Sequence, residues 1–175
     1  MPLPTGTSTR LLALLRHAKA EQHGPTDFER PLAERGHQDA AVVGAWLVGE
    51  GFEADHALVS AALRTRETWA SVAAAAEWDL DAEFDRGLYA AGPDTALDLV
   101  REVDDDVRRL LVIGHNPTIA VLAQLLDDGD GDPDLAEEMM SGYPTGAVAV
   151  FEVDGSWADL EEGGARLVGF HVGRG

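Results

Sequence analysis

The sequence lacks cysteine entirely and has no long hydrophobic run. Without cysteine, disulfide bonds, thiolate nucleophiles and cysteine-ligated zinc or iron–sulfur centres are excluded. The apolar runs are too short to cross a bilayer, and the N-terminal residues lack the apolar segment of a secretion signal. We therefore expect a cytoplasmic protein.

Positive charge is also scarce. The chain has 13 Lys and Arg residues against 32 Asp and Glu residues, which gives a formal net charge of -19. Such a field repels nucleic acids and anionic membranes, so we expect neither as a partner. It also repels an anionic substrate, unless cations gather locally. Every base except Lys19 is an arginine, whose planar guanidinium binds phosphate or carboxylate through two parallel hydrogen bonds.

Length and composition are those of one globular domain. The chain has 175 residues, of which 45% are hydrophobic and 26% are charged, and this is enough to bury a core. The sequence shows no internal repeat and no long linker. We therefore expect a single domain over residues 1–175, in which residues 1–9 form a flexible N-terminal tail.

The spacing of apolar residues predicts alternating strands and helices. Short apolar runs predict strands at 11–15, 57–60, 109–114, 146–153 and 166–172. Helical spacing predicts helices at 33–48, 63–76, 94–103 and 116–126. Asp94 and Asn116 are the expected N-caps, and Pro117 fits the first helical position. The alternation indicates an α/β fold with three layers, in which helices flank both faces of a mostly parallel sheet.

Basic and polar side chains follow three of the predicted strands. Arg16 and His17 follow the first strand, Ser60 and Arg64 follow the second, and His115 follows the third. Taken singly, each has an ordinary reading as a solvated loop residue or a core histidine. Ligands of such folds bind at the carboxyl ends of parallel strands, where these residues meet. Together they predict an anion site.

An acidic stretch at 127–134 superficially suggests a calcium loop. Counted from Asp128, however, Pro133 replaces the required glycine and Met139 replaces the final glutamate. We interpret this stretch as a solvated surface loop. The remaining histidines show no metal-ligand spacing with nearby carboxylates, so no metal site is expected.

Four short motifs occur in one order over residues 11–126: "LLRHAKAE", "ERPLAERG", "VSAALRTRET" and "VIGHNP". This arrangement resembles the histidine phosphatase superfamily. The form RHA in place of RHG, and the short segments between motifs, resemble its SixA-type phosphohistidine phosphatase branch. The resemblance implies a phosphoglycerate mutase-like fold. It also implies a metal-independent phosphatase without a cofactor, which forms a covalent phosphohistidine intermediate.

The resemblance also implies a role for each residue at the strand ends. His17 is the nucleophile, Arg16 and Arg64 clamp the phosphate, and His115 is the second histidine of the pocket. The arginines are expected to lower the pKa of both histidines, which keeps the nucleophile neutral. The implied substrate is phosphohistidine in a partner protein, such as a phosphotransfer domain of a signalling or sugar-transport relay. Phosphate-like anions are expected to bind in the pocket.

One part of the pattern departs from the wider superfamily, whose ester phosphatases carry a glutamate acid shortly before a tyrosine. When Tyr89 is matched to that tyrosine, Arg86 takes the place of the glutamate, and Asp85 is the nearest carboxylate. Without an acid, an alkoxide leaving group is not protonated, whereas imidazole leaves readily. Two alternatives remain open: a phosphatase for a small metabolite ester with Asp85 as its acid, and a non-catalytic phosphate-binding module.

The segment at 21–36 between the first motif and the first helix is short. The resemblance therefore implies a shallow, open pocket, which suits a phosphorylated side chain on a protein surface. Lys19, Arg30 and Arg35 are candidates for its rim. For Arg30 and Arg35, a solvated surface position is the more ordinary reading.

Overall fold

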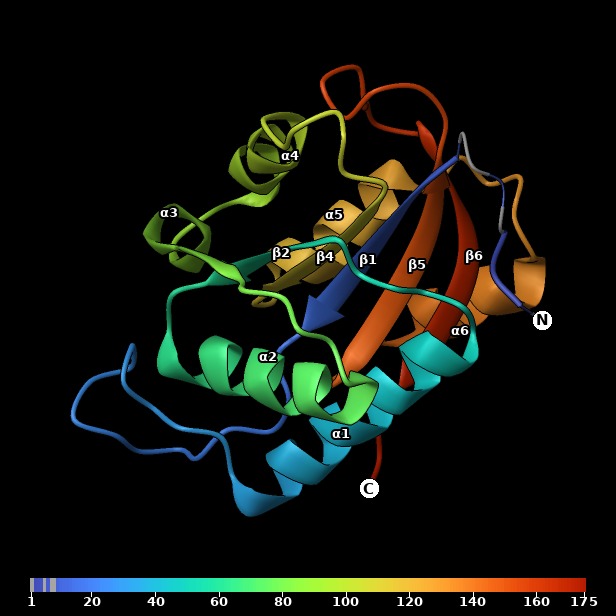
Figure 1. Cartoon of the computed structure of the whole chain (residues 1–175). Helices are drawn as coiled ribbons and strands as arrows, with labels where there is room; N and C mark the ends of the chain where they lie inside the picture. Colours follow the sequence, from blue (N-terminus) through green and yellow to red (C-terminus); the bar gives the residue numbers. More distant parts are fainter. Residues whose placement is uncertain (1, 5, 7–8) are drawn as a thin grey trace.

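One six-stranded sheet with the strand order β3-β2-β4-β1-β5-β6 organises the structure (Figure 1). The computed structural model describes residues 2–4, 6 and 9–175. The strands are β1 (Arg10–Arg16), β2 (His56–Ser60), β3 (Glu83–Asp85), β4 (Arg109–Gly114), β5 (Ala147–Val153) and β6 (Ala165–Val172). Strands β1 to β4 are joined by parallel pairings, while β5 and β6 add antiparallel pairings at one side. The prediction of a mostly parallel sheet is confirmed.

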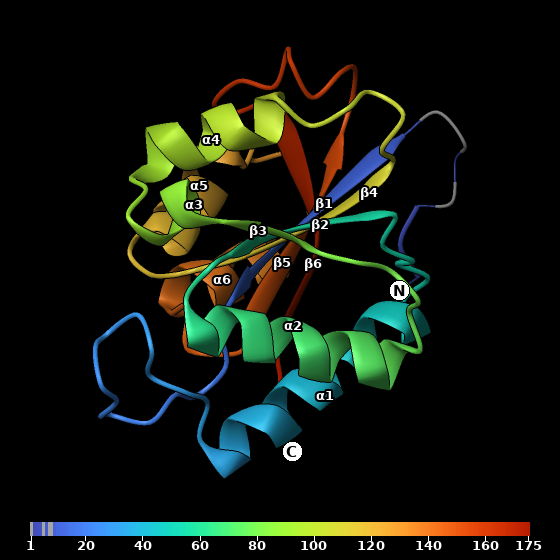
Figure 2. The same cartoon turned by 60° about the vertical axis from the view of Figure 1, so that its left-hand side comes forward.

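Helices cover both faces of the sheet, as the apolar spacing predicts (Figure 2). Helices α1 (Glu34–Gly49) and α2 (Leu63–Ala76) lie on one face. The other face carries α3 (Arg86–Tyr89), α4 (Pro93–Arg101), α5 (Thr118–Leu126) and α6 (Pro133–Ser141). Among the residues that the structure describes, none of these helices has the length and apolar character needed to cross a bilayer.

The central strand β1 is buried on both faces, which explains its unbroken apolar run. Successive side chains of a strand point to opposite faces of the sheet. Leu12 and Leu14 accordingly pack in the cluster under α4 and α5, while Leu11 and Leu15 pack in the cluster under α1 and α2. The apolar run ends at Arg16, because this residue lies at the carboxyl end of the strand, where the sheet stops.

Two predicted helix starts are wrong. Helix α4 begins at Pro93 with Gly92 as its N-cap, so Asp94 lies in the first turn. Helix α5 begins at Thr118, with Pro117 in the N-cap position. The Asn116 side chain still supports this helix, because its Oδ1 accepts a hydrogen bond from the backbone N–H of residue 120 at 3.3 Å.

Three elements have no counterpart in the predicted pattern: β3, α3 and α6. Strand β3 has three residues, too few to show a period, and it pairs only through β2. Helix α6 buries Met139, with Leu135 and Ala136 packed against the same apolar cluster, but it is short and follows an acidic stretch. The surface loop predicted at 127–134 is wrong at its end, because Pro133 and Asp134 lie in the first turn of α6.

The predicted tail at residues 1–9 lies partly outside the described residues. Of those described, Leu3 is 3% exposed, and its N–H donates to the carbonyl of Glu50 at 3.0 Å. Leu3 packs in the apolar cluster under α1 and α2. The assignment of residues 1–175 to one domain stays a prediction.

Candidate active site

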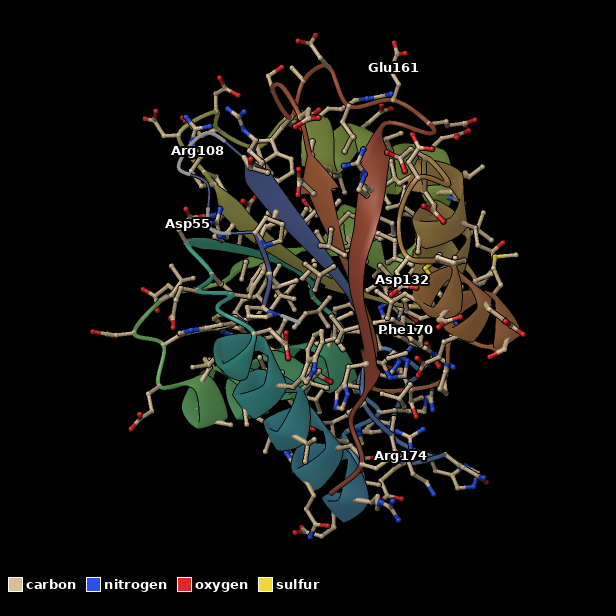
Figure 3. The ribbon with its side chains drawn as sticks, turned by 90° about the vertical axis from the view of Figure 1, so that its right-hand side faces the viewer. Asp55, Arg108, Asp132, Glu161, Phe170 and Arg174 are labelled. Carbon is tan, nitrogen blue, oxygen red and sulfur yellow. The ribbon has the colours of Figure 1, made fainter. Side chains whose placement is uncertain are left out.

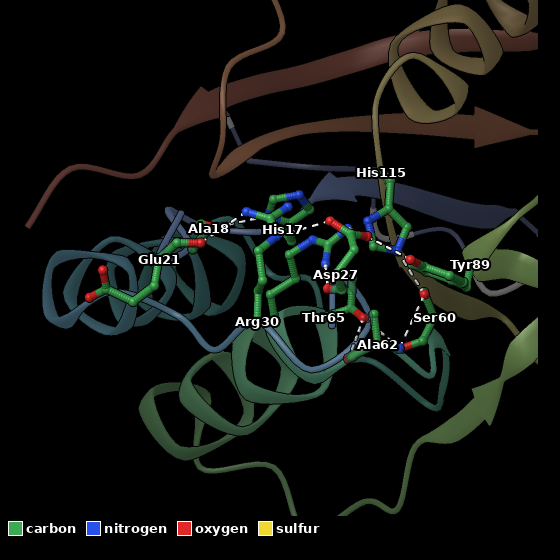
Figure 4. Close-up of polar contacts among 11 residues, drawn as sticks. His17, Ala18, Glu21, Asp27, Arg30, Ser60, Ala62, Thr65, Tyr89 and His115 are labelled. Carbon is green, nitrogen blue, oxygen red and sulfur yellow. Dashed lines mark hydrogen bonds and ion pairs between the residues drawn. The ribbon is translucent and has the colours of Figure 1, made fainter. Parts of the chain in front are cut away.

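The carboxyl ends of the neighbouring strands β2, β4 and β1 border a cavity of about 660 Å³. Arg16 ends β1 and His17 follows it, Arg64 lies in the first turn of α2, and His115 follows β4. All four line the cavity, so the structure brings together the four residues expected to hold phosphate. The rings of His17 and His115 are 5.3 Å apart between centroids (Figure 4).

The protonation of His17 follows from its surroundings. Its Nδ1 lies 2.8 Å from the carbonyl oxygen of Ala18. Because a carbonyl only accepts, Nδ1 carries the proton, and the lone pair of the neutral ring is on Nε2. The side chain is 8% exposed, and this burial, assisted by Arg64 and Arg16, lowers the pKa of His17 to about 4. The ring is therefore neutral near pH 7 with Nε2 available as a nucleophile.

His115 is held from the opposite side of the cavity. Its Nε2 lies 2.7 Å from the Ser60 hydroxyl, which itself accepts a hydrogen bond from the N–H of Ala62. We assign the ring hydrogen to Nδ1, since the Ser60 hydroxyl can donate its own proton to Nε2. Burial, with His17 and Arg64 nearby, lowers the pKa of His115 to about 3. The other ring nitrogen faces the middle of the site (Figure 4).

The two arginines are fixed through part of their guanidinium groups. Arg16 Nη1 donates to the carbonyl of Tyr143 at 3.2 Å. Arg64 Nη1 donates to the backbone carbonyl of Asp27 at 2.8 Å. Of the five buried side-chain nitrogens that find no hydrogen-bond partner within the described part of the chain, three belong to residues that line this cavity: Arg16 Nε, Arg64 Nε and His115 Nδ1. Buried donors are nearly always satisfied, and an oxyanion would satisfy these three.

Asp27 is a site residue that the sequence did not reveal. Its carboxylate accepts hydrogen bonds from Tyr89 Oη at 2.6 Å, Arg30 Nε at 2.9 Å and Arg64 Nη2 at 3.3 Å. The hydrogen bond from Tyr89, followed by the charges of the two arginines, lowers the pKa of Asp27 to about 2. Asp27 is therefore an ionised group that orients arginines. A lone aspartate in a loop gives no pattern that predicts these contacts.

Asp85 is not brought to the cavity. Its Oδ1 accepts a hydrogen bond from the backbone N–H of Leu88 at 2.9 Å, and it caps helix α3. Arg86, which stands where the superfamily glutamate is expected, lies with its guanidinium carbon 5.0 Å from the Phe28 ring centroid. The structure therefore gives Asp85 a capping position and gives Arg86 a stacking position.

The cavity extends beyond the four central residues. It is also lined by the basic residues Lys19, Arg30, Arg35 and Arg174 and by the carboxylate of Asp39. Six of the 13 basic residues of the chain, but one of its 32 acidic residues, line this cavity. Lys19, Arg30 and Arg35 thus line the cavity as the predicted rim residues, whereas no pattern in the sequence predicts that Arg174 joins them. The cations gather locally, as an anion site in this acidic chain requires.

Residues 12–89 match the histidine phosphatase superfamily (branch 1). An uncharacterized protein of Mycobacterium tuberculosis (strain H37Rv) is 42% identical over 162 residues, which cover 91% of this chain and 100% of the relative. The phosphohistidine phosphatase SixA of Escherichia coli (strain K12) is 27% identical over 122 residues, which cover 69% of this chain and 76% of that protein.

Solved structures agree with these sequence matches. The putative phosphohistidine phosphatase SixA of Nakamurella multipartitia has a TM-score of 0.83 and 33% identity, and covers 97% of this chain and 98% of its own. The putative phosphohistidine phosphatase SixA of Agrobacterium tumefaciens has a TM-score of 0.77 and 28% identity. The match covers 93% of this chain and 97% of that protein. The likeness extends over nearly the whole of each chain.

Proposed function

The chain belongs to the SixA-type branch of the histidine phosphatase superfamily, a membership that supports phosphatase activity, and we propose that it removes phosphate from phosphohistidine in a partner protein. The observation that supports phosphohistidine as the substrate is that neither of two nearby carboxyl groups can act as a general acid. Asp85 caps α3 outside the cavity, and Asp27 is ionised by its partners. Neither is placed to protonate an alkoxide, whereas a protonated imidazole needs no acid to leave.

In the proposed complex, the phosphoryl oxygens accept hydrogen bonds from the free donors of Arg16, Arg64 and His115. Phosphoryl transfer depends on positioning the reacting groups and on neutralising the charge of the transferred oxygens. The two guanidiniums supply both, since each presents several donors in a fixed plane. The proposed reaction therefore needs no metal ion or cofactor.

The proposed chemical step uses His17 as the nucleophile. The Nε2 lone pair attacks phosphorus, the bond from phosphorus to the substrate imidazole breaks, and that imidazole leaves with the bonding electrons. The hydrogen bond from Nδ1 to the Ala18 carbonyl keeps the ring oriented and stabilises its developing positive charge. Water then attacks the phosphohistidine at residue 17, releasing inorganic phosphate and the free ring.

The partner that fits this proposal is a histidine-phosphorylated phosphotransfer domain or a similar carrier of a cytoplasmic relay. Two features support it. The four central residues line a cavity at the carboxyl ends of the strands. The SixA protein of E. coli, which shares 27% identity, is named as a phosphohistidine phosphatase.

The alternative, a phosphatase for a metabolite ester, makes a different prediction for Asp85. If Asp85 were the general acid, Asp85→Asn would reduce turnover of an alkyl ester by about a hundredfold or more. We expect a change of less than about twofold, because asparagine caps a helix about as well as aspartate. The measurement is kcat for glycerol phosphate, with the thermal unfolding midpoint as a control for folding. A loss of a hundredfold at unchanged stability would favour the ester phosphatase.

The neutral state of His17 leads to a prediction on pH. We expect its imidazole to titrate near a pKa of about 4, well below the usual histidine value of 6.5, because burial disfavours the charged ring. Between these values the unfolded chain binds more protons, so the free energy of unfolding rises with pH across this window. An NMR titration of the ring protons, assigned with a His17→Gln variant, measures the midpoint. A midpoint near 6.5 would be inconsistent with the buried neutral nucleophile.

Two substrates test the proposed function. A histidine-phosphorylated carrier protein and p-nitrophenyl phosphate are each offered to the wild-type protein and to His17→Ala. We expect fast loss of phosphohistidine and slow ester turnover, both abolished by the substitution. Efficient ester turnover with an inert carrier would indicate the metabolite phosphatase. Binding of phosphate analogues without any turnover or phosphoenzyme would indicate a binding module.

A further inference from the structure

Beyond the residues assigned to phosphoryl transfer, three basic side chains gather in the same cavity from separate segments of the chain. Lys19 lies two residues after His17, Arg35 lies in the first turn of α1, and Arg174 follows β6. The Lys19 carbonyl accepts a hydrogen bond from the backbone N–H of residue 33 at 2.9 Å. A Cβ at Gly36 would lie 2.1 Å from that carbonyl oxygen, so the start of α1 packs directly against the segment after the nucleophile.

Asp39 holds two of these bases in place. Its carboxylate is 3% exposed, accepts a hydrogen bond from Arg35 Nε at 3.3 Å and lies 3.7 Å from Arg174 Nη1. It also accepts the N–H of Gly175 at 3.0 Å. Arg174 Nη1 also donates to the carbonyls of Thr145 at 3.0 Å and Gly173 at 2.6 Å. The two arginine side chains nevertheless remain 53% and 44% exposed, and both residues line the cavity. One buried carboxylate thus anchors two cations and neutralises the charge of one.

The positive charge of the cavity exceeds what the binding of one phosphoryl group requires. Arg16 and Arg64 match the two negative charges of one phosphoryl group. Lys19 has no ion pair within 4.0 Å in the described part of the chain, and the arginine pair on Asp39 keeps one unmatched charge. Arg35 also stands at a helix N-terminus, where the helix dipole disfavours a cation. A second bound anion would compensate both the unmatched positive charge and the unfavourable position of Arg35 at the helix N-terminus.

Arg30 does not belong to this set. Its Nε donates to the Asp27 carboxylate at 2.9 Å, and its Nη1 donates to the carbonyl of Glu21 at 2.9 Å. Arg30 therefore fixes the loop that carries Asp27, and its charge is already matched.

We propose that Lys19, Arg35 and Arg174 form a second anion subsite, which binds a negatively charged group that the substrate carries next to its phosphoryl group. This inference rests on the proposed function, because it assigns the phosphoryl group itself to Arg16 and Arg64. The ligand is an oxyanion, either a carboxylate or a phosphate. In a protein substrate it is an acidic side chain beside the phosphohistidine. In a small substrate it is a second acidic group of the same molecule.

Lys19→Gln tests the subsite, because this exposed side chain has no ion pair whose loss would affect folding. The probes are two synthetic peptides with one phosphohistidine, flanked in one by glutamates and in the other by glutamines. We expect the wild-type protein to prefer the glutamate peptide. The substitution should raise KM for that peptide by about fivefold, the effect of one partly exposed ion pair, with kcat unchanged. KM for the glutamine peptide should not change.

Arg108→Gln is the matched control. It removes one positive charge at the opposite end of the molecule from Arg174 (Figure 3) and should leave both KM values unchanged. An equal rise of KM in Lys19→Gln and Arg108→Gln would show that the effect comes from the overall charge of the protein, and it would overturn the subsite. Arg174→Gln provides a second variant, for which we expect the same selective rise of KM as for Lys19→Gln.

A second pair of probes separates the two sources of the anion: propyl phosphate and propanediol bisphosphate. A preference for the bisphosphate alone, lost in Lys19→Gln, would support the subsite and identify a small substrate. If phosphohistidine is hydrolysed but the wild-type protein prefers neither the glutamate peptide nor the bisphosphate, the subsite is overturned and the proposed function stands. If neither peptide is hydrolysed and no phosphoenzyme forms, the proposed function fails, and the subsite that rests on it fails too.

Discussion

Replacement of His17 by alanine is expected to reduce the rate of phosphohistidine hydrolysis by about a thousandfold or more. The substitution removes the Nε2 lone pair on which the covalent step depends, and loss of a nucleophile typically has effects of this size. The arginines and His115 remain, so binding of inorganic phosphate should persist. The measurement is single-turnover release of phosphate from a phosphorylated carrier, together with phosphate binding by calorimetry.

Two controls make this result specific. His17→Gln fills more of the buried site than alanine and keeps a polar group, so it separates loss of the nucleophile from loss of packing. His56→Gln changes a histidine at the start of β2, where it contacts Glu83, and should leave turnover unchanged. Retention of more than about a tenth of wild-type turnover by His17→Ala would contradict a nucleophile at this position.

Arg64→Lys is expected to reduce kcat/KM by about a hundredfold, although the charge is conserved. The guanidinium of Arg64 binds the Asp27 carbonyl through Nη1 and the Asp27 carboxylate through Nη2, while Nε has no hydrogen-bond partner among the described residues. A lysine ammonium cannot hold Asp27 and direct a second donor in a fixed plane at the same time. Loss of one such preorganised donor in a buried site has an effect of about this size.

Arg66→Lys is the control for this prediction, since Arg66 lies on the same helix and outside the cavity. Its guanidinium carbon lies 6.0 Å from the Phe84 ring centroid, and we expect a change in kcat/KM of less than about twofold. If Arg64→Lys stays within about threefold of the wild-type value, fixed guanidinium geometry is not required, and a point charge suffices.

The sequence predicted the centre of the fold well because the central strands are buried on both faces. The predicted bounds of β4 (Arg109–Gly114) and α2 (Leu63–Ala76) agree with the structure. Each element ends where the chain changes from apolar to polar residues or meets a turn. Elements at the periphery were missed, since β3 has only three residues and the short apolar pattern of α6 follows directly on an acidic stretch.

The same reasoning explains which parts of the site could be predicted. Arg16, His17, Arg64 and His115 follow predicted strands or begin a predicted helix, so the sheet alone brings them to one edge. Asp27 and Arg174 lie in irregular segments, and their places are set by contacts with distant residues. The net charge of -19 describes the whole chain and conceals the basic cavity, which forms only when separate segments fold together.

The measurement that tests the account most directly is rapid-quench trapping with a carrier protein that carries radiolabelled phosphohistidine. We expect the label to appear first on His17, in the acid-labile and base-stable form that phosphohistidine shows, and afterwards as inorganic phosphate. The labelled residue is identified by mass spectrometry of a protease digest. Release of labelled phosphate without any label on the enzyme, or transfer of the label to a different residue, would contradict the account.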